Sequence, residues 1–107
     1  MIATFEQLAV HDGIEYQELD AYGLKLLIGS LSSEQVRKWS EAQEADPEYA
    51  QEAGLWLLIL SLVDANNNRI PEEDHKRWLA LFRNKSEGHN SKVIEQILIL
   101  NSLTTTE

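Results

Sequence analysis

The segment from Ala53 to Val63 constrains the fold of this chain more than any other part of the sequence. Eight of its eleven residues are large and apolar, and they leave no polar face when placed on a helix. The unbroken run Leu55–Leu60 is far shorter than the roughly 20 residues that a membrane span needs, so we expect no transmembrane segment. Such a helix is therefore predicted to lie in a protein core or in an interface.

Chain length limits how completely this helix can be covered. The sequence has 107 residues, which is the size of one domain. A domain of this size buries about two-thirds of the surface of its unfolded chain, so an all-apolar helix is difficult to surround. We expect a second subunit to cover part of it, with Trp56 and Ile59 as candidate contacts, although Trp56 also fits a core position.

Capping residues predict further helices on both sides of this segment. Ser32 and Gln35 form a capping-box pair at the start of a helix that runs to about Ala45. Asp46 and Pro47 then either restart a helix or kink a continuous one. The remaining helices are expected over Phe5–Val10 after the cap residue Thr4, from Pro71 onward, and over Ser91–Leu103 after a polar loop at Asn84–Asn90.

Alternating residues near the N-terminus predict a β-hairpin. Ile14–Gln17 and Leu24–Ile28 read as two strands, and Asp20–Gly23 reads as the turn between them. A lone hairpin is marginal in water, so it is expected to lean on helices or on a strand of another chain. The competing interpretation is a helix over Leu19–Leu27, which two glycines weaken.

Together these elements predict a mainly α fold, a small helical domain of four to five helices with a short N-terminal β-hairpin. A single domain would span residues 1–107, with a short helix and the hairpin in 1–31, the helical body in 32–103 and a flexible tail in 104–107. The chain has no cysteine, and its N-terminus lacks the basic and long apolar regions of a signal peptide. We therefore expect a cytoplasmic protein without a membrane partner.

Acidic side chains are concentrated in the first half of the chain. The formal net charge is -9; residues 1–53 hold 11 acidic and 3 basic side chains, whereas residues 54–107 hold 7 and 6. An acidic surface repels phosphate backbones and anionic lipid, so nucleic-acid binding is not expected. Solubility is the default explanation of this charge, and docking to a basic protein, for example as a DNA mimic, is the alternative.

No residue pattern indicates a catalytic, cofactor or metal site. Asp64–Asn68 resembles the start of a calcium-binding EF-hand loop, but the sixth position is Arg69 instead of glycine and the twelfth is His75 instead of glutamate. This segment is therefore predicted to be a turn between two helices. The histidines are not spaced as metal ligands, and no nucleophile or phosphate-binding motif occurs. We expect no enzymatic activity, no cofactor and no small-molecule substrate.

Candidate protein-binding residues are those with large apolar or acidic side chains on predicted helices. Trp39 stands on an otherwise polar helix, which makes it a candidate for an exposed anchor. A solvated face is the default for the acidic residues that follow it, and a docking patch is the alternative. Besides Trp56 and Ile59, the candidates are Trp39, the acidic Glu41, Glu44 and Glu48, and Ile97 and Leu100 on the last helix.

Within residues 14–103, five short segments follow one another in an order that is typical of one protein family. They are a Leu-Ser-Ser-Glu helix start at Leu31–Glu34, a Leu-Ser-Leu-Val-Asp segment at Leu60–Asp64, an Asn-rich turn with Arg69, an acidic helix start at Pro71–Asp74, and a closing Leu-Asn-Ser-Leu at Leu100–Leu103. This order resembles the tail assembly chaperones of long-tailed bacteriophages and prophages. Pro47 and the strongly aliphatic last helix depart from the family pattern.

The resemblance implies a function that is not enzymatic. Proteins of this family self-associate in the bacterial host cytoplasm, coat the tape measure protein before the tail is built, and hand over to tail tube subunits. A longer frameshifted form often accompanies the short form, and there are no catalytic residues to carry over. The predicted function is therefore that of a homo-oligomeric tail assembly chaperone, and the alternative is a small acidic inhibitor or DNA mimic that acts on a host protein.

Overall fold

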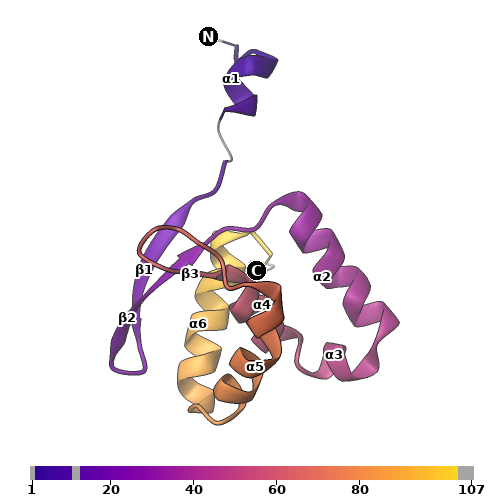
Figure 1. Ribbon diagram of the computed structural model, residues 1–107, viewed down its shortest axis with the longest axis vertical. Coiled ribbons are helices and arrows are strands. Elements are labelled where there is room, and N and C mark those ends of the chain that lie inside the picture. Colours follow the sequence, from indigo (N-terminus) through magenta and orange to yellow (C-terminus); the bar gives the residue numbers. More distant parts are fainter. Residues whose placement is uncertain (1, 11–12, 104–107) are drawn as a thin grey trace, which may run out of the picture.

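A computed structural model describes residues 2–10 and 13–103, which form six α-helices and a three-stranded antiparallel sheet (Figure 1). The mainly helical class is confirmed, with one helix more than the upper number predicted; the predicted tail at 104–107 lies outside the described residues. The elements are α1 (Phe5–Ala9), β1 (Tyr16–Ala21), β2 (Leu24–Gly29), α2 (Ser33–Ala45), α3 (Pro47–Gln51), α4 (Ala53–Ser61), β3 (Leu62–Val63), the 3-10 turn η1 (Glu72–Asp74), α5 (His75–Arg83) and α6 (Glu87–Leu100).

The N-terminal hairpin is present, but its bounds differ from the prediction. β1 begins at Tyr16 and continues to Ala21, so the turn contains only Tyr22 and Gly23. The φ angles of these two residues are 58° and 74°, as a type I′ turn requires. β1 and β2 pair along their whole length, so the alternative of a helix over Leu19–Leu27 is wrong.

The all-apolar segment forms the centre of the body, but it is not helical throughout. α4 ends at Ser61, and Leu62–Val63 form β3, which pairs with Leu27 and Ile28 of β2. α4 packs against α2, α3, α5 and α6, and Ile59 has no exposed surface. The chain thus covers most of this helix itself, and the expected cover by a second subunit is not needed there.

Local side-chain hydrogen bonds set the bounds of α2 and α3. The Ser32 hydroxyl accepts from the backbone N–H of Gln35, whose side chain accepts from the Ser32 N–H, as the capping box predicts. Asp46–Pro47 ends α2 and starts α3, so the chain restarts a helix here instead of kinking one. Trp39 Nε1 donates to the carbonyl oxygen of Ala53 at 2.9 Å, which holds α2 against the start of α4.

The last helix begins one turn before its predicted start, because a buried asparagine stabilises its first turn. α6 starts at Glu87, inside the predicted loop Asn84–Asn90. Asn90 is 3% exposed; its amide donates to the carbonyl oxygen of Phe82, and its Oδ1 accepts from the Tyr22 hydroxyl at 2.5 Å. These bonds tie the hairpin turn to α5 and α6, so a polar sequence is helical here.

The short helix α1 stands apart from the rest of the molecule (Figure 1). Thr4 caps its start as predicted, and together with Gln7 it forms a capping box. The side chains of Phe5 and Leu8 are 81% and 64% exposed, and those of Ile2 and Val10 are exposed as well. The residues His11-Asp12-Gly13 are predicted from the sequence to break this helix, and His11 and Asp12 lie outside the described residues.

Candidate protein-binding groove

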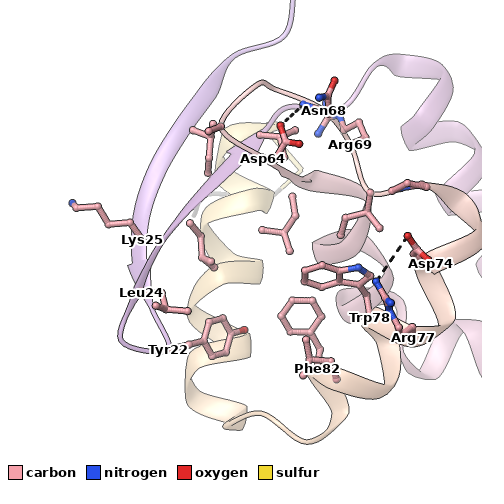
Figure 2. Close-up of a pocket in the computed structure, with 18 of the residues that line it drawn as sticks. Tyr22, Leu24, Lys25, Asp64, Asn68, Arg69, Asp74, Arg77, Trp78 and Phe82 are labelled. Atoms are coloured by element: carbon pink, nitrogen blue, oxygen red, sulfur yellow. Dashed lines mark hydrogen bonds and ion pairs between the residues drawn. The ribbon is translucent and has the colours of Figure 1, made fainter.

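A groove of about 680 Å³ lies between β2 and α5 (Figure 2). Tyr22 and Leu24 approach it from the hairpin, and Trp78 and Phe82 approach it from α5. The loop from Asp64 to Arg69 lies at its other end. We call this site the β2–α5 groove.

The groove exists because β3 is only two residues long. β3 pairs with Leu27 and Ile28, so among the described strands the Leu24–Leu26 half of β2 has a partner on its β1 side alone. α5 lies across the groove from this half of the strand (Figure 2). The lining is therefore built from side chains of β2 on one side and of α5 on the other.

Apolar side chains form the interior of the groove. Phe82 is buried and Trp78 half-buried, with ring centroids 5.9 Å apart. Leu81 is 44% exposed and Leu24 also remains exposed. The β2–α5 groove thus offers an aromatic floor and accessible aliphatic edges, the kind of surface on which protein partners bury their anchor residues.

Basic side chains outnumber acidic ones around the groove, whereas acidic side chains predominate in the molecule as a whole. Four of the nine Lys and Arg residues line it, but only two of the eighteen acidic residues do. Lys25 pairs with Asp20 at 3.6 Å and Arg77 with Asp74 at 4.0 Å, and such exposed pairs exchange readily with other partners. The lining residues concerned are the basic Lys25, Arg69, Arg77 and Lys85 and the acidic Asp64 and Asp74.

The Asp64–Arg69 loop is a structural turn. Asp64 Oδ1 accepts from the backbone N–H groups of Asn66 and Asn68 at 2.8 and 3.0 Å, and the bond from Asn68, followed by that from Asn66, lowers the pKa of this carboxyl. Val63 and Arg69 form an antiparallel bridge. The turn therefore brings the chain back alongside β3, whereas the sequence predicted a link between two helices.

Arg69 holds this end of the groove together. Its guanidinium donates to the carbonyl oxygens of Ser30 at 2.6 Å and Ser61 at 3.0 Å. It also donates to those of Gly29 at 3.2 Å and Leu60 at 3.3 Å. One side chain thus joins the end of β2 to the end of α4.

The predicted contact residues lie elsewhere, and none of them lines the β2–α5 groove. Ile59 and Ile97 are fully buried, so their assignment as partner contacts is wrong for this conformation. Trp39, Trp56 and Leu100 are half-buried against the core, and Trp56 stacks on Tyr49 at 5.0 Å. Of the acidic candidates, Glu41 accepts from Arg37 at 2.6 Å, and Glu44 and Glu48 are exposed.

The groove could not be predicted from the sequence because its two walls come from separate elements. The apolar residues of Leu24–Ile28 and of the helix after Pro71 are visible in the sequence, but their juxtaposition depends on the short β3. That strand was predicted as the last turn of a helix. An all-apolar run does not by itself distinguish a buried helix from a buried strand.

Within residues 2–10 and 13–103, no three His, Asp or Glu side chains gather as metal ligands would, and no helix combines the length and apolarity needed to cross a bilayer. His75 Nε2 lies 3.1 Å from the carbonyl oxygen of Ile70. No family model, no curated protein and no solved structure matches this chain.

Proposed function

We propose that this protein is not an enzyme but binds another protein, whose apolar segment it receives in the β2–α5 groove. The observation that carries this proposal is an open apolar lining whose edge residues Leu24 and Leu81 remain exposed. Aromatic and aliphatic side chains in such hollows supply most of the binding energy at protein interfaces. A helix or strand with an apolar stripe fits a groove walled by one strand and one helix.

We further propose that the partner is a tape measure protein and that the role is that of a tail assembly chaperone. The chaperone would bind the tape measure protein before the tail tube protein assembles on it. The order of segments that resembles this family supports the proposal. Two pairs of these segments are also in contact: the backbone N–H of Leu31 donates to Asn101 Oδ1 at 2.7 Å, and the Arg69 guanidinium donates to the carbonyl oxygen of Leu60. Segments of the resembling order therefore contact one another in the folded chain.

Binding of tape measure fragments tests this proposal. Overlapping fragments of the tape measure protein from the same genome would be titrated against the full chain and followed by fluorescence anisotropy. We expect Leu81→Glu to weaken binding at least tenfold, because a carboxylate replaces an apolar contact. Ile99→Glu is the matched control, since Ile99 is 52% exposed but lies on α6 outside the groove. Failure of every fragment to bind, or equal loss in both variants, would refute the proposal.

An acidic inhibitor or DNA mimic is the second candidate, favoured by the exposed acids on α2 and α3. Glu44 and Glu48 are exposed, and α2 and α3 together carry four acidic residues and two bases. This function predicts capture of a basic nucleic-acid-binding host protein at low salt and its release at high salt. A charge-reversing pair, Glu44→Lys with Glu48→Lys, should abolish that capture and leave tape measure binding unchanged.

A further inference from the structure

The N-terminal arm, residues 2–10, carries apolar side chains that the rest of the chain does not cover. Half of the eight large hydrophobic residues with high exposure in the described chain belong to it. Phe5 and Leu8 are three residues apart, so they lie on one side of the capped helix α1. Within residues 2–10 and 13–103, this apolar side of α1 thus stays largely uncovered.

The arm and the β2–α5 groove are complementary in charge as well as in polarity. Residues 1–24 contain five acidic side chains and no Lys or Arg, and Glu6 lies within α1 itself. The groove collects four of the nine basic side chains of an otherwise acidic protein. An apolar segment flanked by acids therefore fits an apolar groove edged by bases.

The geometry of the sheet favours exchange of this arm between copies. The strand order is β1-β2-β3, so the arm leaves its own sheet from the β1 edge. The groove lies on the opposite side of β2, next to β3, and Figure 1 shows α1 directed away from the body. An arm would have to cross its own sheet to reach its own groove, whereas a second copy can present its arm directly.

We propose that α1 of one copy docks in the β2–α5 groove of a second copy, with Phe5 and Leu8 on the apolar lining and Glu6 toward Lys25, Arg77 and Lys85. Reciprocal exchange buries two arms in a closed dimer. This inference rests on the proposed function in one respect, because the arm occupies the groove that the partner protein enters. Self-association and partner binding then exclude each other.

Complementation between two variants tests the docking. Phe5→Glu impairs the arm and keeps the groove, whereas Leu81→Glu impairs the groove and keeps the arm. Light scattering across a concentration series should show each variant dissociating at concentrations at least tenfold higher than the wild-type protein, and Ile99→Glu dissociating like the wild type. An equal mixture of the two variants should regain association through one intact contact. A monomeric wild-type protein, unchanged association of Phe5→Glu, or a mixture that stays monomeric would each overturn the inference.

Cysteine cross-linking decides whose groove the arm enters. The chain has no cysteine, so Phe5→Cys and Leu81→Cys can be placed on separate copies without competing thiols. Oxidation of the mixture should yield a mixed disulfide dimer. If the double variant instead closes the bond within one chain at low concentration and the mixture yields no dimer, the arm fills its own groove and the inference is wrong.

The two proposals fail in different experiments. Phe5→Glu keeps the groove and removes the competing arm, so it should bind tape measure fragments at least as tightly as the wild type. Normal fragment binding with no arm-dependent association would overturn only the docking inference. Arm-dependent association without fragment binding would overturn only the proposed function.

Discussion

Arg69 is a polar residue whose removal should destabilise the folded body. Its guanidinium donates to four carbonyl oxygens, from Gly29, Ser30, Leu60 and Ser61. Hydrogen bonds from a charged donor contribute roughly 1.5–3 kcal/mol each, though not additively. We expect Arg69→Ala to lower the free energy of unfolding by about 3 kcal/mol in urea titrations.

The conservative variant separates geometry from charge. Arg69→Lys keeps the charge but offers one ammonium in place of a planar fork, so it should lose about half as much stability. Arg77→Ala, an exposed arginine of the same region, should stay within about 0.5 kcal/mol of the wild type. Equal stability of Arg69→Ala and Arg77→Ala would contradict the role given to Arg69.

Asp64 makes a pH-dependent contribution to the turn beside the groove. Backbone N–H groups of Asn68 and Asn66 lower the pKa of its carboxyl below its ordinary value. A group with a lowered folded-state pKa stabilises the protein above its unfolded-state pKa, and this contribution is lost as pH falls through the folded-state value. Asp64→Asn should therefore lower Tm near neutral pH, and the difference from wild type should begin to shrink as pH falls below the ordinary Asp pKa of about 3.9 and vanish only below the lowered folded-state pKa. A difference in Tm that is the same at every pH would refute this.

At the scale of elements, the start of α6 depends on a contact that is distant in sequence. Asn90 accepts from the Tyr22 hydroxyl and donates to the Phe82 carbonyl while almost fully buried. Asn90→Ala leaves both partners unsatisfied, so we expect a loss of about 2 kcal/mol in the free energy of unfolding. Asn84→Ala is the control, because Asn84 is exposed and bonds only to its own helix. Comparable losses in the two variants would contradict a buried anchor.

The same contrast shows which elements could be predicted from sequence. The starts of α1, α2 and α3 were predicted correctly because Thr4, Ser32 and Asp46 bond to residues two or three positions away. β3 and the first turn of α6 depend on β2 and on Tyr22, which lie far away in the sequence. Local patterns carry no information about such partners, so both elements were assigned to the wrong structure.

At the scale of the whole molecule, the location of the spare apolar surface was predicted wrongly. The uncovered apolar surface was expected on the all-apolar helix. In the structure, α2, α5 and α6 cover α4 closely enough to leave Ile59 without exposed surface. Six of the eight exposed large hydrophobic residues of the described chain lie instead on the N-terminal arm or along the groove, and the other two are Tyr16 and Ile99. A surface of this kind cannot be read from hydrophobicity alone, because it depends on which elements the fold brings together.

Net charge gives the whole molecule a distinct dependence on salt. Two copies carry -9 each, so they repel at low ionic strength, where the Debye length is about 30 Å. Arm docking adds local attraction between Glu6 and the basic edge of the groove, but most of its contacts are apolar and insensitive to salt. Raising ionic strength from about 10 to 150 mM shortens the Debye length to about 8 Å. Because this removes repulsion first, we expect the dimer dissociation constant to fall several-fold.

Above 150 mM the remaining salt effect comes from the arm itself, so the dissociation constant should level off or rise slightly. Glu6→Gln should remove that rise without changing the improvement at low salt, because it alters the dimer charge little and the local pair entirely. Light scattering at five or six salt concentrations would measure the dissociation constant both below and above 150 mM. An acidic inhibitor that captures a basic partner behaves in the opposite way, since its affinity falls from the lowest salt onward. Whether the affinity rises or falls as salt is first added therefore distinguishes association of like-charged copies from docking to a basic host protein.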